Sequence, residues 1–474
     1  MDKKLCDFLE FEKDEKLFAR IYKGVSYWQC VRYDIQRAIS FNEMNRIGNS
    51  SQHRQAVLRK AGSLLQHGLG DLMAAIHLGT GELLYFDEQF YRYVDGKLAD
   101  TCFDYFGFDN QLSVQRCYHH DASEKRAQCT GIGVSAAALL QGGLYKMSKI
   151  VPSMFADVQE DKFIIDLCKS ISLKFGIDIR ADRIIQKVKD VVLHHKIYGK
   201  YYKWIIKRVK PKAIFVVSHF DSKLFPLYEV AHKSHVPVIE LEHGLVTNHE
   251  AYNYRDLTAE GKYLPDFFFT YGDFWTQYVQ LPVCMKPIAV GNSFLESQKK
   301  KYSNITPDEK KIVFYSGGIG LEQAQFVIDF YKRNVKNGYH VCFKPHPVEY
   351  SDFDKLYPVF EEYPEICIIP KEMNLYELLA SAKHHVAAAS TVLFEAAIFD
   401  VKRYVMYMPE WIQYIQPLID IGLAEVFHSL DELQELLERE KNVDKSMLEF
   451  IWKSNASANA LEALDNIISG RTVY

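Results

Sequence analysis

The stretch "AIFVVSHFDSKLFPLYEVAHKSHVPVIELEHG", residues 213–244, decides the fold because its apolar rhythm changes twice. Its first part, 213–220, is an apolar run that ends in polar residues and predicts a strand. Residues 222–235 have helical periodicity, and 236–244 predict a second strand. A strand, a helix and a strand in this order predict a parallel sheet with helices on its faces.

The same alternation recurs further along the chain. "DFFFTYGDF" (266–274) predicts a third strand, and "VGNSFLESQKKKYSNITPDEKK" (290–311) predicts a linker. After it, four strands are predicted in "KIVFYSGG" (311–318), "YHVCFKPHP" (339–347), "EICIIPK" (365–371) and "HHVAAAS" (384–390). Helices are predicted in "LEQAQFVIDFYKRNV" (321–335), "NLYELLASA" (374–382), "TVLFEAAIF" (391–399) and "HSLDELQELLERE" (428–440). Asn374 with Glu377, and Ser429 with Glu432, have capping-box spacing.

The rest of the sequence divides the chain into three predicted regions, 1–290, 291–440 and 441–474. Helices are expected in the first 60 or so residues and in 154–209, with short strands and turns between 81 and 107. We therefore expect an α/β domain with helical insertions at 1–290 and a second α/β domain at 291–440. Two doubly wound halves would place a cleft between them, with ligands at the carboxyl ends of the strands. Residues 441–474 are predicted as helices.

Composition limits the class of protein. The 474 residues are 48% hydrophobic and 25% charged with net charge −4, so nothing calls for a nucleic-acid partner. Aromatic residues reach 14%, with 30 tyrosines, which is more than a plain core requires. Three features predict a cytoplasmic protein. The nine cysteines include no CxxC pair, the N-terminus is acidic, and no apolar run approaches the roughly 20 residues of a bilayer span.

A lysine and a histidine lie between prolines at one predicted strand end, "KPHP" (344–347). Because Pro345 and Pro347 end regular structure, the chain must turn there. Lys344 and His346 suit the phosphates of a nucleotide-activated donor, and the imidazole could protonate the departing phosphate. The alternative is a turn whose polar side chains face water.

A second strand end, "AAASTVLFEAA" (387–397), runs directly into a predicted helix. Ser390 and Thr391 would lie at its N-terminus, where free N–H groups and the dipole favour an anion. Glu395, one turn later, could accept hydrogen bonds from ribose hydroxyls. The alternative is a helix cap and a solvated glutamate.

A third strand end, "YSGG" (315–318), offers Ser316 and Gly317 as nucleotide contacts, because glycine lets the backbone approach a ligand closely. Its spacing differs from the dinucleotide and P-loop motifs.

In the first half, "ELEHG" (240–244) ends a strand with Glu242 and His243, and a carboxylate beside an imidazole can act as general base for an acceptor hydroxyl. Asp221, which follows His219 at the neighbouring strand end, is a rival base or nucleophile. For each the alternative is a polar side chain satisfied in a turn.

Metal is not expected. "DFD" (352–354) follows no apolar strand and reads as a solvated loop or helix start, and the pairs His194–His195 and His384–His385 lack helical zinc spacing.

Segment 187–212, "KVKDVVLHHKIYGKYYKWIIKRVKPK", is cationic and amphipathic. It suits an anionic membrane surface or glycolipid, or else a helix that packs its aromatics into the core.

Together these stretches resemble bacterial GT-B glycosyltransferases of the capsule and surface-polysaccharide type. That group includes β-Kdo transferases, bacterial sialyltransferases and, more remotely, teichoic-acid glycerophosphotransferases. The resemblance is carried by "KGVSYWQCVRYDI" (23–35), "YVDGKLADTCFDYF" (93–106), "ELEHG", "LPDFFFTYGDFW" (264–275), "KPHP" and "STVLFEAA" (390–397). The sequence has "FDVKR" (399–403) where the group usually has Gly-x-Pro, and Glu242-His243 where sialyltransferases have an acidic pair.

The resemblance implies a GT-B fold, two Rossmann-like domains facing a cleft with extra N-terminal helices, and a transferase without metal or other cofactor. Domain 1–290 would be the acceptor side, and domain 291–440 would bind the nucleotide sugar. It implies that Lys344, His346, Ser390 and Thr391 hold the donor phosphate, that Glu395 contacts the ribose, and that Glu242 or Asp221 is the catalytic carboxylate. The donor would be a nucleotide sugar, CMP-linked Kdo or a sialic-type acid, and the acceptor a surface glycan or glycolipid at the inner face of the cytoplasmic membrane. The alternatives are a CDP-glycerol-type or UDP-sugar transferase, or a glycan-binding scaffold without activity. The tail 441–474 would cross back to the N-terminal domain.

Overall fold

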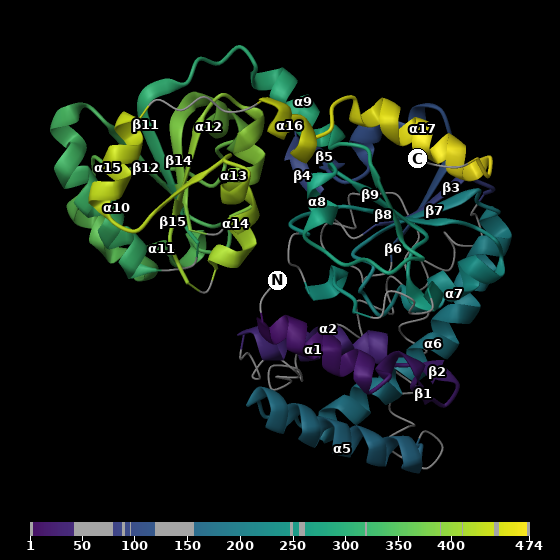
Figure 1. The fold of residues 1–474 in the computed structure, drawn as a ribbon. Coiled ribbons are helices and arrows are strands. Elements are labelled where there is room, and N and C mark those ends of the chain that lie inside the picture. Colours follow the sequence, from purple (N-terminus) through teal and green to yellow (C-terminus); the bar gives the residue numbers. More distant parts are fainter. Residues whose placement is uncertain are drawn as a thin grey trace. The chain divides into compact units, whose positions relative to one another are not determined.

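The structure of the chain, a computed structural model, describes residues 3–41, 79–87, 91–94, 96–118, 156–246, 250–255, 261–317, 320–388, 390–409, 411–439 and 445–471 (Figure 1). The chain forms two compact units. The first contains Met1–Thr270, Val279–Val290 and Ser457–Tyr474, and the second contains Tyr271–Tyr278 and Gly291–Ala456. The predicted tail segment is thus divided, with 441–456 in the second unit and 457–474 in the first.

The first unit is built on a six-stranded parallel sheet with strand order β10-β9-β8-β7-β3-β6. Its strands are β3 (Leu83–Asp87), β6 (Val114–Tyr118), β7 (Ala213–Val217), β8 (Val238–Leu241), β9 (Phe267–Thr270) and β10 (Lys286–Ala289). The three strands predicted between 213 and 274 are confirmed, and β3, β6 and β10 extend the sheet by three strands that the sequence interpretation left outside it. In chain order the sheet reads 2-1-3-4-5-6, a doubly wound topology of the flavodoxin kind with one added strand.

Helices and two hairpins surround this sheet. They are α1 (Lys3–Asp14), α2 (Trp28–Phe41), α5 (Val158–Phe175), α6 (Ala181–Val209) and α7 (Phe225–Lys233), the hairpins β1 (Ile21–Tyr22) with β2 (Val25–Ser26) and β4 (Tyr91–Val94) with β5 (Lys97–Asp100), and α17 (Ala456–Ile468). Helices α1, α2, α5 and α6 share one apolar core with strands β3 and β7. The prediction of helices in the first 60 or so residues is confirmed in part, because α1 and α2 are helices whereas residues 21–26 form the β1–β2 hairpin.

A buried ion pair holds the N-terminal helices to the sheet unit. Glu12 accepts hydrogen bonds from Arg32 Nε at 2.6 Å and from Trp28 Nε1 at 2.6 Å. Arg32 also donates to the carbonyl of Asn253 at 2.8 Å and lies 4.4 Å from the ring centroid of Tyr254. Because both charged side chains are almost fully buried, their pairing offsets a desolvation cost that neither could bear alone.

The second unit has a six-stranded parallel sheet of order β13-β12-β11-β14-β15-β16. Its strands are β11 (Asp308–Tyr315), β12 (His340–Lys344), β13 (Cys367–Ile368), β14 (Ala382–Ala387), β15 (Lys402–Met406) and β16 (Glu425–Phe427). In chain order this is 3-2-1-4-5-6, the order of the Rossmann fold. The predicted fold class, two parallel α/β sheets of the doubly wound type with added helices, is confirmed.

Helices cover both faces of this second sheet. They are α9 (Ser293–Tyr302), α10 (Leu321–Asn334), α11 (Phe353–Leu356), α12 (Leu375–Ser381), α13 (Val392–Glu395), α14 (Ile412–Asp420), α15 (Leu430–Glu438) and α16 (Lys445–Ile451), with α8 (Phe274–Gln277) joining from the earlier segment. Helices α10 and α15 lie on one face and α12, α13 and α14 on the other (Figure 1). The predicted caps are confirmed, because Asn374 accepts from the N–H of Glu377 and Ser429 from that of Glu432.

Two predictions for this unit are wrong. The stretch 290–311 is not a linker, because α9 occupies 293–302 and begins at Asn292, whose side chain caps the N–H of Leu295 at 2.9 Å. The helix predicted over 391–399 is a single α turn, α13, followed by a 3₁₀ turn at Ala396–Ile398. Elements β15, α14 and β16 were not predicted.

Candidate active site

Three strand ends of the second unit that carry predicted site residues lie side by side. Strand β11 pairs with β12 on one side and with β14 on the other, and Tyr315 is in register with Lys344. Because parallel strands are about 4.8 Å apart, the exits of β12 and β14 lie roughly 10 Å from each other across β11. The sheet order reverses between β11 and β14, and ligands of open α/β sheets bind at this switch point. Ser316, the 344–347 turn and Ser390 therefore belong to one candidate site.

Glu349 organises the turn, although the sequence interpretation gave it no role. Its carboxylate is 8% exposed and accepts hydrogen bonds from Ser316 Oγ at 2.9 Å, Tyr357 OH at 2.9 Å and the backbone N–H of His346 at 2.7 Å. The N–H of Glu349 donates in turn to the carbonyl of His346 at 2.9 Å. One buried carboxylate thus joins the exits of β11 and β12 and fixes the backbone on which His346 stands.

Lys344, at the end of β12, and His346, in the turn after it, lie in different environments. Lys344 Nζ donates to Tyr350 OH at 2.6 Å, and that hydroxyl donates to the carbonyl of Ile369 at 2.8 Å. Burial lowers the pKa of Lys344. The His346 side chain is exposed, and its Nδ1 accepts from the N–H of Val348 at 3.5 Å, which leaves Nε2 to carry the proton of the neutral ring. The turn therefore presents an ammonium and an imidazole N–H at the end of one strand.

The exit of β14 differs from the expected helix tip. Thr391 is exposed, and Ser390 Oγ accepts from the N–H of Val392 at 3.3 Å. Glu395 accepts from Tyr376 OH at 2.5 Å. Since α13 contains only four residues, too few peptide dipoles are aligned to give the predicted anion-binding macrodipole. The hydroxyls of Ser390 and Thr391 remain candidate phosphate donors at this exit, and the contact of Glu395 with the ribose stays a prediction.

The backbone of Gly317 is engaged by the following helix. Its N–H donates to Gln323 Oε1 at 3.2 Å, while Gln323 Nε2 donates to the carbonyl of Tyr315 at 2.8 Å. This fully buried glutamine closes the β11 exit, so Ser316 rather than the Gly317 N–H faces the neighbouring turn.

The predicted carboxylates of the first unit lie at the exits of β7 and β8. Glu242 is 2% exposed, and its N–H donates to the carbonyl of Phe269 at 3.0 Å. Asp221 is partly exposed, and its Oδ1 accepts from the N–H of Lys223 at 2.9 Å. His243 Nε2 lies 3.4 Å from Ser218 Oγ, and Ser218 has a left-handed φ of 56°, a strained conformation for a residue other than glycine. The structure therefore brings His243 beside the end of β7, whereas Asp221 fixes its own turn.

A second buried carboxylate, Glu240, was not predicted. It accepts from the N–H of His219 at 2.9 Å and from Tyr252 OH at 2.8 Å, and His219 Nδ1 lies 2.9 Å from its Oε2. Burial opposes ionisation of Glu240, but the charge and hydrogen bonds of His219 outweigh it and lower the carboxyl pKa. A glutamate inside the apolar run "VIELE" was the available signal.

The His384–His385 pair lies in the core of the second unit. Both rings of His384 and His385 are buried, and desolvation lowers their pKa values to about 4 and about 3. His385 Nδ1 lies 2.9 Å from Tyr315 OH. Within the described ranges, no three His, Cys, Asp or Glu side chains are grouped in a way that could hold a metal ion.

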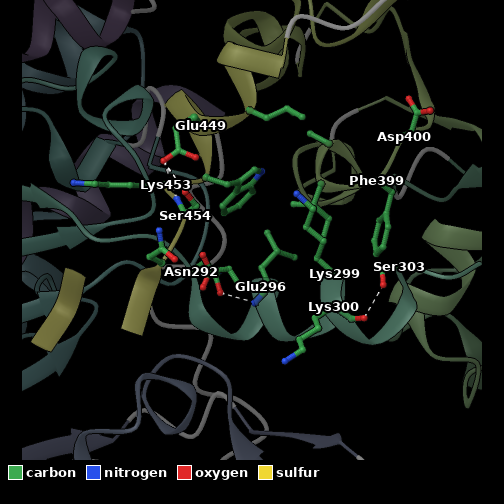
Figure 2. A pocket seen from close by; sticks show the side chains of 16 residues that line it. Asn292, Glu296, Lys299, Lys300, Ser303, Phe399, Asp400, Glu449, Lys453 and Ser454 are labelled. Atoms are coloured by element: carbon green, nitrogen blue, oxygen red, sulfur yellow. Dashed lines mark hydrogen bonds between the residues drawn. The ribbon is translucent and has the colours of Figure 1, made fainter. Parts of the chain in front are cut away.

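A cavity of about 1160 Å³ lies elsewhere in the second unit and contains none of the predicted site residues. Figure 2 shows Lys299 and Lys300 of α9, Asp400 and the Glu449–Ser454 segment around it. Three lysines and three carboxylates line it, so their charges balance. Glu449 accepts from the N–H and Oγ of Ser454, both at 3.0 Å, and thus serves the local fold.

The cationic segment 187–212 forms the C-terminal part of α6 and the turn after it. Tyr198, Tyr202 and Ile206 are buried in the core of the first unit, as the structural alternative expected, whereas Trp204 is 40% exposed. No helix among the described residues is long and apolar enough to cross a membrane.

No protein-family model and no curated protein matches the chain. Among solved structures, the UDP-GlcNAc 2-epimerase from Neisseria meningitidis bound to UDP-GlcNAc is similar at 11% identity and TM-score 0.44, over 80% of this chain and 97% of that chain. The UDP-N-acetylglucosamine 2-epimerase from Rickettsia bellii is similar at 12% identity and TM-score 0.43, over 81% and 96%. The wall teichoic acid polymerase TagF is similar at 11% identity and TM-score 0.43, over 91% and 98%. Because these identities and scores are low, the function is inferred from the residues of this chain alone.

Proposed function

We propose that this chain is a glycosyltransferase of the GT-B type that uses a nucleotide-activated sugar. The observation that carries the proposal is the grouping of Lys344, His346, Ser316 and Ser390 at the three adjacent strand ends around the switch point of a Rossmann-type sheet. Phosphate groups bind at such positions, and an ammonium, an imidazole N–H and the Ser390 hydroxyl are donors that match phosphate oxygens.

In the proposed reaction, the second unit stabilises the leaving nucleotide. The Lys344 ammonium and the His346 Nε2–H would neutralise charge that develops on the phosphate as the glycosidic bond breaks. Ser390 and Thr391 would add hydrogen bonds to the same group. No metal ion or other cofactor is assigned a role, so transfer should persist when divalent cations are chelated.

In the first unit, the proposed base for the acceptor hydroxyl is Glu242 or Asp221, with His243 beside it. Substituting each carboxylate separately, Glu242→Gln and Asp221→Asn, tests this role by the rate of transfer to acceptor relative to donor hydrolysis. Asp221 also fixes its turn through Lys223, so its variant needs an unfolding measurement alongside.

The finer proposal is a CMP-linked donor, Kdo or a sialic-type acid, and a surface glycan or glycolipid acceptor. Purified full chain should release CMP from CMP-Kdo or CMP-sialic acid, whereas consumption of CDP-glycerol or a UDP-sugar instead would identify the other transferase classes. His346→Ala should abolish release. His340→Ala, an exposed histidine at the opposite end of β12, is the matched control and should leave the rate unchanged. If none of these donors is consumed with or without a glycan acceptor, the transferase proposal fails.

We extend the proposal to peripheral binding of an anionic membrane by the end of α6. Lys203, Lys207 and Lys210 line a shallow hollow there, next to the exposed Trp204. The chain should sediment with vesicles that contain phosphatidylserine but not with phosphatidylcholine vesicles, and Lys203→Glu/Lys207→Glu should prevent sedimentation. Equal sedimentation of the variant would remove this part of the proposal.

A further inference from the structure

Two cysteines lie opposite each other on neighbouring strands of the second sheet. Cys342 of β12 is in parallel register with Cys367 of β13, and both are free thiols. Paired residues of neighbouring strands point to the same face of a sheet. Strand spacing places their Cα atoms about 4.8 Å apart, inside the range of about 4.4–6.8 Å that a disulfide requires.

The two thiols differ in their access to solvent. Cys367 is exposed on β13, a two-residue strand at the edge of the sheet. Cys342 is 3% exposed; burial, with the neighbouring Cys367 thiol adding to it, raises the pKa of Cys342 to about 12, while the Lys311 ammonium opposes this shift. A soluble reagent therefore reaches Cys367 first, and Cys342 is the sheltered partner.

We propose that Cys342 and Cys367 form a dithiol modification site that a hydroperoxide oxidises to an intramolecular disulfide. In the first step the Cys367 sulfur attacks the peroxide, the O–O bond breaks, and a sulfenic acid and water (or an alcohol, from an organic hydroperoxide) are formed. In the second step the Cys342 sulfur, losing its proton, displaces hydroxide from the sulfenic acid, and the S–S bond and a second water are formed. The two thiols lose two electrons and the peroxide gains two. Exchange with a small thiol reverses the modification.

The two cysteines are close in sequence to the residues that hold Lys344 in place. Strand β12 ends at Lys344, two residues after Cys342, and Ile369 directly follows β13. The Ile369 N–H donates to the carbonyl of Phe343 at 2.8 Å, and its carbonyl accepts the hydroxyl that Lys344 contacts. A disulfide would covalently join β12 and β13, the two strands that hold the ends of this chain of hydrogen bonds.

The test is oxidation of the folded full chain with hydrogen peroxide, followed by alkylation of remaining thiols with N-ethylmaleimide and peptide mapping without reductant. The expected product is one cross-linked peptide pair containing Cys342 and Cys367, lighter by two hydrogens and split by dithiothreitol. Cys367→Ser should abolish the cross-link. Cys342→Ala should leave Cys367 as a sulfenic acid that dimedone labels. Cys284, partly buried in the first unit, is the internal control: it should remain a thiol during oxidation and be alkylated afterwards.

Three results would overturn the inference. One is oxidation of Cys367 to a sulfinic acid in the wild type while Cys342 remains alkylated. The second is a disulfide that joins Cys367 of two chains. The third is cross-linking that persists at the same rate in Cys367→Ser. Because Cys367 is exposed, its serine variant is expected to fold, which keeps the test decisive even if the buried Cys342→Ala variant does not.

Discussion

Glu349→Gln changes one atom of the buried carboxylate that joins the exits of β11 and β12. The glutamine oxygen can still accept from Ser316 and Tyr357, but the amide nitrogen would face the N–H of His346, which donates to Glu349 Oε2 at 2.7 Å. Two hydrogen bonds lose the negative charge that strengthens them, and the third is replaced by two opposed donors.

The magnitude follows from these three contacts. A hydrogen bond to a charged group contributes about 1.5–3 kcal/mol and a neutral one about 0.5–1.5 kcal/mol, and a buried unpaired donor costs about 1–3 kcal/mol. Because the three contacts share one side chain they are not additive, and a loss of about 3 kcal/mol is expected. In a unit of this size the melting temperature should fall by about 6–12 °C.

The assay combines urea unfolding with hydrogen exchange at the 344–350 turn. Exchange reads the N–H of His346 directly, so Glu349→Gln should raise its exchange rate more than that of amides in β14. Glu361→Gln, an exposed glutamate in the same unit, is the matched control and should change neither measurement. An unfolding free energy for Glu349→Gln within the error of this control would refute the role of the buried carboxylate.

Three further perturbations test other parts of the structure. Arg32→Met leaves Glu12 buried without its cation and should lower the free energy of urea unfolding by about 3–5 kcal/mol. Adding Glu12→Gln should recover much of this loss, and an unchanged free energy in Arg32→Met would contradict a buried pair. Burial, with the charge of Asp87 adding to it, raises the pKa of Asp100 from 3.8 to about 7, so the stability that this group contributes is complete below pH 3.8 and disappears as the pH rises through about 7. Asp100→Asn should therefore flatten the unfolding free energy measured across that pH window, and an unchanged slope would count against the assignment. Asn292→Ala removes the cap of α9 and should cost about 1 kcal/mol in thermal unfolding, whereas Asn292→Ser should cost little.

The alternation of strands and helices was predictable because period and strand-end chemistry are local properties of the sequence. The linker prediction failed for a local reason as well. Lysines at 299–301 made the stretch look like a solvated connection, although Asn292 in front of Phe294 and Leu295 is a cap before an apolar helix face. Here the cap predicted the helix better than the charge did, because the residues directly after Asn292 are buried.

The grouping of the candidate site could be predicted only in part. That Lys344, His346 and Ser390 follow strands is local information, and the carboxyl ends of parallel strands must meet at one edge. Which strands are neighbours is not local, since β14 pairs with β11 although the 382–387 segment lies about 70 residues further along the chain. The early end of α13 was also not predicted, since the helical pattern of 391–399 continues past Glu395 whereas the chain changes there to a 3₁₀ turn at Ala396–Ile398.

The high tyrosine content is explained by hydrogen bonds to carboxylates, which no sequence motif describes. Tyrosine hydroxyls donate to carboxylates in both units: Tyr22 to Asp161, Tyr27 to Glu160, Tyr85 to Asp100, Tyr252 to Glu240, Tyr357 to Glu349 and Tyr376 to Glu395. A carboxylate that leaves water needs donors, and a phenol supplies one without adding a second charge that must itself be desolvated. It also brings a ring that fills the core around the acid. A fold can therefore hold carboxylates in position with aromatic residues, without placing beside each one a cation that must itself lose its water.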